Sequence, residues 1–272
     1  MSDPEPYGVI AGNGRFPFLL LEAARGRNLR MVVAAIKEET DPAIERHAAQ
    51  TEWLSLGQLG KLIDFFHRAG VRRAVMAGQV KHRQIFSHLR PDWKMAMLLA
   101  SLATRNTDSL LGGVARVLEE EGIQLESSTQ FLEPMLAGPG VMTQRAPDER
   151  ERRDLTYGLE VARHLAAMDI GQAVAVASGA CVAAEAMEGT DAMIARAGAL
   201  AAGRPLVVVK VAKPRQDLRF DVPVVGPGTI TAMRTAGATA LLVDAGITLM
   251  LERSEMLRQA DTAGIAMEGQ PR

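Results

Sequence analysis

The stretch that decides the fold is Tyr7-Gly8-Val9-Ile10-Ala11-Gly12-Asn13-Gly14, followed by a helical pattern that begins at Pro17. Its first five residues form a short apolar run, which is typical of a buried strand, and its last three indicate a tight turn. Proline fits the first turn of a helix. A second apolar run, MVVAAI at residues 31–36, predicts the next buried strand. This order predicts a parallel sheet with helices on its faces.

The same alternation continues to about residue 126. Gly70 and Gly78 end a helical and a strand-like pattern, and Asp108 is a suitable N-cap for a later helix. The expected elements are helices at residues 56–69, 92–104 and 108–121, and strands at 71–77 and 123–126. Together they predict a first domain with a Rossmann-like parallel sheet at residues 1–134.

Prolines and glycines gather in residues 133–147, which makes this stretch the best linker candidate. Beyond it, antiparallel and α/β patterns are mixed, so we expect a mixed α/β domain at residues 135–272. The two apolar runs on either side of Ser178-Gly179-Ala180 predict a hairpin. The expected elements are helices at residues 148–168, 190–201, 229–236 and 255–263, and strands at 172–177, 181–186, 206–212 and 240–243.

Composition narrows the class of protein. The 272 residues suffice for about two domains. Lys and Arg number 31 against 32 Asp and Glu, without a basic run, which disfavours nucleic-acid binding.

Cys181 is the one cysteine, so no internal disulfide can form and a reducing compartment is indicated. Residues 1–6 are acidic, unlike a signal peptide, and the apolar run 95–103 is shorter than the roughly 20 residues that span a bilayer. We expect a cytoplasmic location.

The turn Gly12-Asn13-Gly14 is the first motif that could carry chemistry. Glycines let the backbone approach a phosphate, and a helix N-terminus offers N–H groups and a favourable dipole. An ordinary strand-to-helix turn is the alternative. NAD binding is only weakly supported, because Pro17 replaces the third glycine of the fingerprint and Lys37 and Glu38 share the position of the usual acid.

The second motif surrounds the start of a helix at Thr190. Glu185 and Glu188 follow an apolar strand, and Gly189-Thr190-Asp191 opens the helix. Carboxylates beside a helix N-terminus can hold Mg²⁺ or orient a phosphate. The alternative is that Thr190 or Asp191 merely caps the helix.

The third motif runs from Lys210 to Gly226 and is the densest in charge. After a buried strand it places Lys213 directly before Pro214, and Asp217, Arg219 and Asp221 between Pro214 and Pro223. Cations can clamp phosphate oxygens, and a carboxylate among cations stays ionised and able to bind metal or accept a proton. A solvated salt-bridge loop is the alternative interpretation.

Taken in order, these motifs resemble the UDP-2,3-diacylglucosamine pyrophosphatases of the LpxI type. The resemblance covers about residues 7 to 268. The matching stretches are IAGNGRFP (10–17), AGQV (77–80), TDSLL (107–111), DIGQAVAV (169–176), AAEAMEGTDAMIARA (183–197) and KVAKPRQDLRFDVPVVGPGTI (210–230).

The resemblance implies a reaction. Water attacks the α-phosphorus of UDP-2,3-diacylglucosamine and gives 2,3-diacylglucosamine 1-phosphate (lipid X) and UMP, in lipid A biosynthesis, with Mg²⁺ or another divalent cation required. It also implies two α/β domains, the first binding nucleotide and the second catalytic, with the substrate in the cleft between them. The partners would be the acylated UDP-sugar and lipid X. We further expect transient contact with the inner-membrane surface and a homodimer.

The family's critical aspartate matches Asp221, and Asp217 is the second choice. Lys213 and Arg219 are the predicted phosphate-clamping cations, and Asp221 and Asp191 the predicted metal ligands. The predicted substrate-binding residues are Gly12, Asn13, Gly14, Gly78, Gln79, Asp108, Glu185, Thr190, Asp191 and Gln216. Two other functions stay open on the residues alone: an NAD(P)-dependent oxidoreductase and a non-catalytic protein that binds an acyl sugar or nucleotide.

Overall fold

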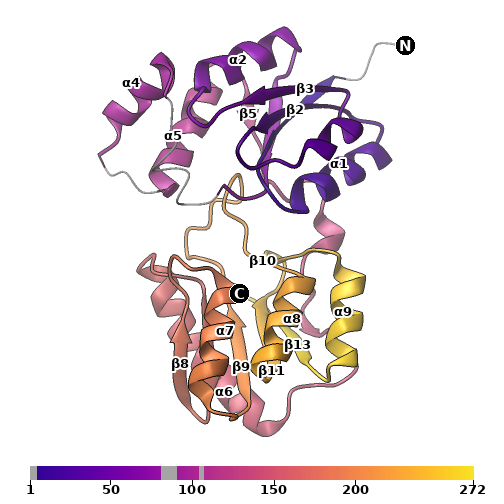
Figure 1. Ribbon diagram of the computed structural model, residues 1–272, viewed down its shortest axis with the longest axis vertical. Helices are drawn as coiled ribbons and strands as arrows, with labels where there is room; N and C mark the ends of the chain where they lie inside the picture. The colour runs from indigo at the N-terminus through magenta and orange to yellow at the C-terminus, as the bar shows by residue number, and fades with distance from the viewer. Residues whose placement is uncertain (1–4, 81–90, 104–106) are drawn as a thin grey trace. The chain divides into compact units, whose positions relative to one another are not determined.

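The computed structural model describes residues 5–80, 91–103 and 107–272. The chain forms two compact units, the first of residues 1–132 with 217–221 and the second of residues 133–216 with 222–272. Each unit is built on its own sheet with packed helices (Figure 1). The expected two-domain α/β fold, with one parallel and one mixed sheet, is confirmed.

The first unit holds a five-stranded sheet in the order β3-β2-β1-β4-β5, with every pair parallel. Its strands are β1 (Pro6–Ala11), β2 (Arg30–Ile36), β3 (Gln50–Leu54), β4 (Arg73–Ala77) and β5 (Gln124–Leu125). Its helices are α1 (Phe16–Gly26), η1 (Pro42–His47), α2 (Leu59–Arg68), α4 (Trp93–Ser101) and α5 (Thr107–Glu120). The central strands are apolar throughout because helices cover both faces of a parallel sheet.

Two features of this unit differ from the sequence expectation. Strand β3 was not predicted, because it is an edge strand in which only Leu54 is buried and no apolar run marks it. Asp108 lies in the first turn of α5, which begins at Thr107, so the N-cap prediction is wrong. The expected helix at residues 92–104 ends at Ser101, and residue 104 lies outside the described residues.

The second unit holds a six-stranded sheet in the order β6-β13-β11-β9-β7-β8. Strands β9, β11 and β13 are parallel, whereas β6, β7 and β8 pair antiparallel with their neighbours. The hairpin β7–β8 was predicted. The strands are β6 (Gly140–Val141), β7 (Ala173–Ala177), β8 (Ala180–Ala184), β9 (Leu206–Lys210), β11 (Ala238–Asp244) and β13 (Ala266–Gln270), beside a small parallel pair, β10 (Val224–Val225) and β12 (Leu249–Met250).

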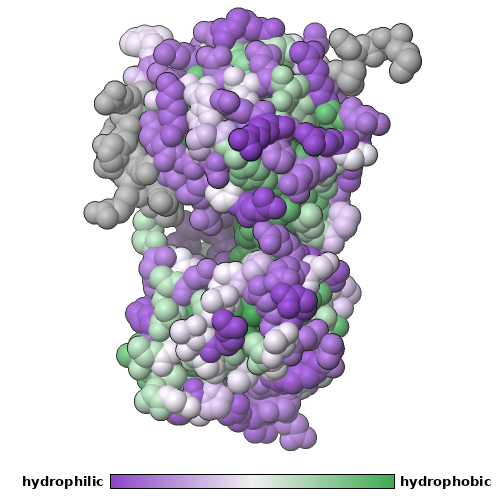
Figure 2. Space-filling view, turned by 45° about the vertical axis from the view of Figure 1, so that its right-hand side comes forward, coloured by the Kyte–Doolittle hydropathy of each residue, from purple (hydrophilic) through white to green (hydrophobic). Residues whose placement is uncertain are grey.

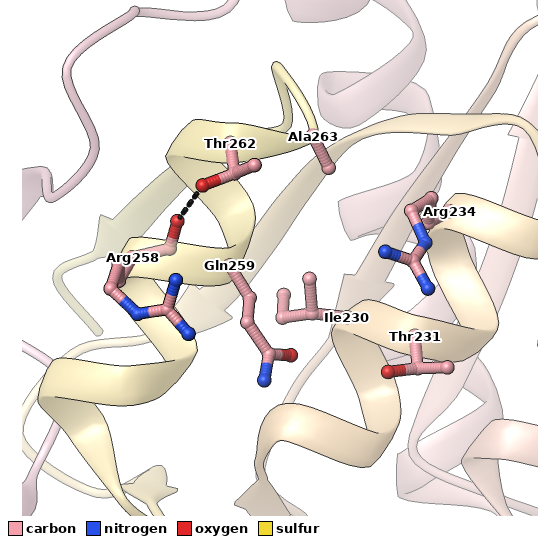
Figure 3. A pocket seen from close by; sticks show the side chains of 7 residues that line it. All are labelled: Ile230, Thr231, Arg234, Arg258, Gln259, Thr262 and Ala263. Carbon is pink, nitrogen blue, oxygen red and sulfur yellow. Dashed lines mark hydrogen bonds between the residues drawn. The ribbon is translucent and has the colours of Figure 1, made fainter.

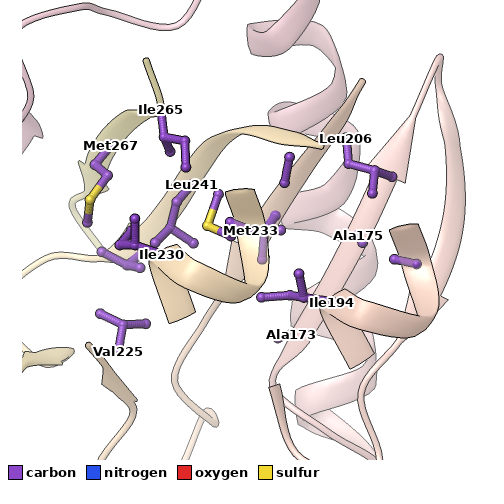
Figure 4. Packing of buried hydrophobic residues seen from close by; sticks show 14 of the residues in the cluster. Ala173, Ala175, Ile194, Leu206, Val225, Ile230, Met233, Leu241, Ile265 and Met267 are labelled. Carbon is purple, nitrogen blue, oxygen red and sulfur yellow. The ribbon is translucent and has the colours of Figure 1, made fainter. Parts of the chain in front are cut away.

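Helices cover both faces of this second sheet. They are α6 (Glu149–Ala167), α7 (Thr190–Ala201), α8 (Pro227–Ala236) and α9 (Arg253–Thr262). Along β7, Val174 and Val176 belong to the cluster under α6, whereas Ala173 and Ala175 belong to the cluster under α7 to α9. This is the alternation that a strand buried on both faces produces. In Figure 4, side chains from α7 and α8 point toward those of the sheet and fill the layer between them.

The stretch between the two sheets is more ordered than a plain linker. Residues 133–135 form a 3₁₀ turn, η2 (Glu133–Met135), and Gly140 and Val141 pair with Gly269 and Glu268 of β13. The linker interpretation of residues 133–147 is therefore wrong for its later part, which belongs to the second sheet.

Hydrophilic residues cover much of the face that Figure 2 shows, with hydrophobic residues scattered among them. Within the described ranges, no helix is both long enough and apolar enough to cross a membrane.

Candidate functional site

The carboxyl ends of β1 and β4 form the topological switch point of the first sheet. From β1 the chain passes through α1 to β2 on one side, while β4 lies on the other side. The loops after the two strands are joined by backbone hydrogen bonds from Gly12 N to Ala77 O (2.8 Å) and from Asn13 N to Gln79 O (2.8 Å). Ligands of open parallel sheets bind outside the strand ends at such a point.

Glycines make this close approach of the two loops possible. A Cβ atom on Gly12 would lie 2.5 Å from the carbonyl oxygen of Gln79, and one on Gly78 would lie 2.5 Å from that of Asn13. Gly78 also has a φ of +90°, and Gly14 has a φ of +87° with no atom within 4 Å of its Cβ position. The structure thus brings five predicted substrate-binding residues together, with open space at Gly14.

The turn after β2 adds a residue that the sequence analysis missed. Asn13 Nδ2 donates to Glu39 Oε2 at 2.6 Å, and the Thr40 hydroxyl donates to the carbonyl of Ala11 at 2.6 Å. Sequence reasoning stopped at Lys37 and Glu38, the first residues after the strand. The carboxylate that faces the glycine turn belongs to the next residue, Glu39.

The charged segment of residues 217–221 is held at this same edge of the first sheet. Ser128 N donates to Leu218 O (2.8 Å), and the Ser128 hydroxyl is 2.9 Å from Arg219 O and 2.5 Å from Met76 O. Phe220 packs against the apolar core of the first unit. Because Met76 lies in β4 two residues before Gly78, the segment is tied to the strand that carries the glycine loop.

Within this segment the two aspartates have different surroundings. The Asp217 carboxylate accepts hydrogen bonds from Arg219 Nε at 2.9 Å and from a terminal guanidinium nitrogen of Arg219 at 2.7 Å. These hydrogen bonds lower the pKa of Asp217 and raise that of Arg219. Asp221 is half-buried, and its N–H closes a turn onto Asp217 O at 2.9 Å. Asp217 is therefore engaged by an arginine, one turn before Asp221.

Lys213 and Gln216 lie in the second unit. Lys213 Nζ is 2.7 Å from Asp169 Oδ1, and the Lys213 N–H donates to Gln216 Oε1 at 2.6 Å. The charged stretch that looks continuous in the sequence is thus divided between the two units. The phosphate-clamping role of Lys213 stays a prediction.

The carboxyl edge of the second sheet carries a chain of buried polar groups. Lys210 Nζ donates to the Thr190 hydroxyl at 2.5 Å, which donates to Glu185 Oε1 at 2.7 Å. Glu185 and Lys210 are each 8% exposed. Asp191 Oδ2 lies 3.4 Å from the Cβ position of Gly228, in the first turn of α8.

The structure therefore brings Glu185 and Thr190 into contact, whereas the Asp191 carboxylate lies beside the first turn of α8. Their role in binding substrate stays a prediction. Glu188 is engaged elsewhere, because its carboxylate accepts a hydrogen bond from Arg196 at 2.5 Å. This hydrogen bond lowers the pKa of Glu188. Lys210 was missed as a site residue, although a lysine that ends the apolar strand LVVVK was the available signal.

An ion pair between the buried Asp244 and the partly exposed Arg163 fixes the strand end that leads into the charged segment. Asp244 is fully buried and accepts Arg163 in a bidentate pair at 2.7 and 2.5 Å. The same carboxylate accepts the N–H of Ala212 at 2.7 Å. Asp244 thus joins β11 and α6 to the residue that precedes Lys213.

In the part of the chain that the structure describes, no group of three or more His, Cys, Asp or Glu residues is placed to hold a metal ion. The predicted ligands Asp221 and Asp191 belong to different units. Mg²⁺ commonly takes one or two protein carboxylates and completes its shell with water and substrate phosphates. A single half-buried carboxylate such as Asp221 fits that donor set.

Two surface grooves lie away from these clusters. One, of about 300 Å³, separates α8 from α9, with Arg234 on one side and Arg258 on the other (Figure 3). The other, of about 420 Å³, lies along α6 between Arg152 and Glu160. Neither contains a predicted site residue.

Residues 6–135 match the LpxI N-terminal domain, and residues 138–268 match the LpxI C-terminal domain. A relative from Caulobacter vibrioides, named UDP-2,3-diacylglucosamine pyrophosphatase LpxI, is 31% identical over 272 residues, 96% of each chain.

Similarity to solved structures is much weaker. The biotin carboxylase domain of the Hydrogenobacter thermophilus 2-oxoglutarate carboxylase is 12% identical with a TM-score of 0.28, over 66% of this chain and 36% of that chain. The biotin carboxylase subunit of a pyruvate carboxylase is 11% identical with a TM-score of 0.26, over 69% and 39%.

Proposed function

Because the chain belongs to the LpxI family, we propose that it hydrolyses the diphosphate of UDP-2,3-diacylglucosamine to lipid X and UMP, a step of lipid A biosynthesis. The observation that carries the proposal is the full-length similarity to the Caulobacter pyrophosphatase, which spans both units. The chemistry of the first sheet edge supports it, because the glycine turn follows β1 and the carboxylate segment is tied through Ser128 to the neighbouring strand β4.

The glycine turn is the proposed seat of the nucleotide end of the substrate. Gly14 is open, and the first N–H groups of α1, which begins two residues later, have no partner within the helix. A phosphate there would gain hydrogen bonds and a favourable dipole interaction.

Asp221 is the proposed group that orients and deprotonates the attacking water at the α-phosphorus. A well-placed general base contributes about 10²–10⁴-fold to a rate. Arg219 lies two residues away and would offset negative charge that develops on the diphosphate, although it also binds Asp217. The low pKa of Asp217 keeps that carboxylate ionised beside Arg219.

A divalent cation, with Mg²⁺ as the first choice, is part of the proposal. Asp221 is the proposed first ligand and Asp191 the second. When bound, Mg²⁺ would neutralise charge on the diphosphate oxygens.

Contact with a membrane surface is proposed through α4, since the substrate carries two acyl chains. Met95 and Leu98 anchor this helix in the core, whereas Trp93 is 77% and Met97 57% exposed on its other face. Tryptophan favours the interface between lipid and water. Such contact would place the protein on the cytoplasmic face of the inner membrane. Equal co-sedimentation of wild type and Trp93→Ala with phospholipid vesicles would contradict this role for α4.

The predicted homodimer stays a prediction.

The test is release of UMP from UDP-2,3-diacylglucosamine by the purified chain with Mg²⁺. We expect turnover by the wild type, loss of turnover with EDTA, and a rate about 10²–10⁴-fold lower for Asp221→Asn. Glu38→Gln, an exposed change outside the proposed site, should keep the wild-type rate.

Circular dichroism of each variant shows whether it is folded. Full activity of a folded Asp221→Asn variant would overturn the role of Asp221, and the absence of UMP with the wild type would overturn the function.

The same assay decides between the other two functions. A non-catalytic binding protein would retain the acyl sugar without releasing UMP. The oxidoreductase interpretation gains no support from the site, because the third-glycine position holds Pro17, whose Cγ lies 3.0 Å from the Cβ position of Gly78.

A further inference from the structure

The turn after β2 is fixed firmly to the end of β1. Glu39 N and Thr40 N both donate to Ile36 O, at 3.0 and 2.8 Å. The Thr40 hydroxyl accepts Ile36 N at 3.0 Å and donates to Ala11 O at 2.6 Å. Thr40 is only 6% exposed, so a buried side chain holds this turn beside the residue that precedes Gly12.

Three charged residues follow β2, and one of them faces the glycine turn. Lys37 and Glu38 are exposed, whereas Glu39 is half-buried. Glu39 Oε2 accepts Asn13 Nδ2 at 2.6 Å. The carboxylate of Glu39 therefore lies directly beside the turn that is the proposed seat of the nucleotide.

This placement has a chemical consequence for a nucleotide. In open parallel sheets that bind nucleotides at the switch point, the phosphate takes the turn after the first strand. The ribose then extends toward the end of the neighbouring strand, where an acidic residue accepts its 2′-hydroxyl. Here that neighbouring strand is β2, and Glu39 is the acid beside the turn. A carboxylate accepts up to about four hydrogen bonds, so Asn13 and a ribose hydroxyl can share it.

We propose that Glu39 recognises the ribose 2′-hydroxyl of a nucleotide seated at Gly12-Asn13-Gly14, and so selects ribonucleotides over deoxyribonucleotides. The proposal rests on the proposed function and deepens it: it takes uracil as the base from that function, but it concerns binding and not hydrolysis.

The test compares binding of UMP and 2′-deoxyuridine 5′-monophosphate to the full chain by isothermal titration calorimetry. We expect the wild type to bind UMP about tenfold or more tightly than the deoxy compound, as expected for loss of a hydrogen bond to a charged group. In Glu39→Ala the two affinities should become equal, through weaker UMP binding and with deoxy binding unchanged within about twofold. Glu39→Gln should retain part of the preference, and Glu38→Gln all of it.

Three results would overturn the proposal. They are absence of UMP binding to the wild type, equal affinities of the wild type for both nucleotides, and an unchanged ratio in Glu39→Ala. A drop in both affinities by the same factor in Glu39→Ala leaves the ratio unchanged and would show that Glu39 only positions Asn13.

This failure can be told apart from failure of the proposed function. Hydrolysis of UDP-2,3-diacylglucosamine without Glu39-dependent discrimination rejects the ribose contact alone. A Glu39-dependent preference for UMP without hydrolysis rejects the proposed function and leaves the ribonucleotide site.

Discussion

The carboxyl edges of the two sheets are built in different ways. At the first, backbone meets backbone: Gly12 and Gly78 let two loops touch, and their main-chain groups bond each other. At the second, buried charged and polar side chains do the joining, through Lys210, Thr190 and Glu185, and through Asp244. The first edge should therefore tolerate no added volume, whereas the second should tolerate no unpaired charge.

The largest effect is expected from added volume at the first edge. Gly12→Ala and Gly78→Ala place a methyl group 2.5 Å from a backbone oxygen, so each should lower the free energy of unfolding by about 3 kcal/mol or more. Gly14→Ala is the matched control, with open space but a positive φ, and should cost about 1 kcal/mol. Urea denaturation measures all three. An equal loss of stability in Gly12→Ala and Gly14→Ala would contradict the claim that close contact between the two loops limits the volume at this edge.

The next effect is expected from an unpaired charge at the second edge. Asp244→Asn leaves the Arg163 guanidinium without its buried carboxylate and should lower the free energy of unfolding by about 3 kcal/mol. The control is Glu188→Gln, which breaks an exposed pair with Arg196 and should cost less than about 1 kcal/mol. If the two variants unfold at the same urea concentration, buried pairs do not brace this edge.

The smallest effect tests whether side-chain pairs also brace the opposite end of the second sheet. There Arg145 bonds the buried Glu151 and the carbonyl of Thr239. Burial alone would raise the pKa of Glu151, but hydrogen bonds from Arg145 outweigh it and lower the pKa to about 2. The pKa difference alone corresponds to roughly 3 kcal/mol, but Arg145 is partly exposed to solvent. Glu151→Gln should therefore lower the free energy of unfolding by about 2 kcal/mol at pH 7.

The pH dependence of this effect has a definite sign. The pKa of Glu151 in the folded protein lies below the unfolded value of about 4.3. Its contribution to the free energy of unfolding is therefore fully present above about pH 4.3. It is lost as the pH falls toward 2. Urea titrations of wild type and Glu151→Gln should therefore converge in acid, and a difference that persists at pH 2 would contradict the assignment.

Strong apolar runs made much of the fold predictable. β1, β2, α6 and the β7–β8 hairpin follow from patterns that local sequence contains. The missed strands β3, β6, β10, β12 and β13 are short, polar or at an edge, so that pairing with a neighbour and not their own composition makes them strands.

The candidate site was predictable only where its residues are adjacent in sequence. The glycine turn and the Glu185–Asp191 stretch were found in this way. Glu39 and Ser128 act through contacts with distant residues, Asn13 and the 217–221 segment, and nothing local marks them. For the same reason the charged segment was expected in the second domain, whereas its contacts join it to the first unit.

The most direct test of the central claim is hydrolysis of UDP-2,3-diacylglucosamine in ¹⁸O-labelled water, with mass spectrometry of both products. Attack at the α-phosphorus predicts one ¹⁸O in UMP, none in lipid X, and little product from a folded Asp221→Asn variant. Label in lipid X, absence of UMP, or equal UMP from the variant would contradict the account.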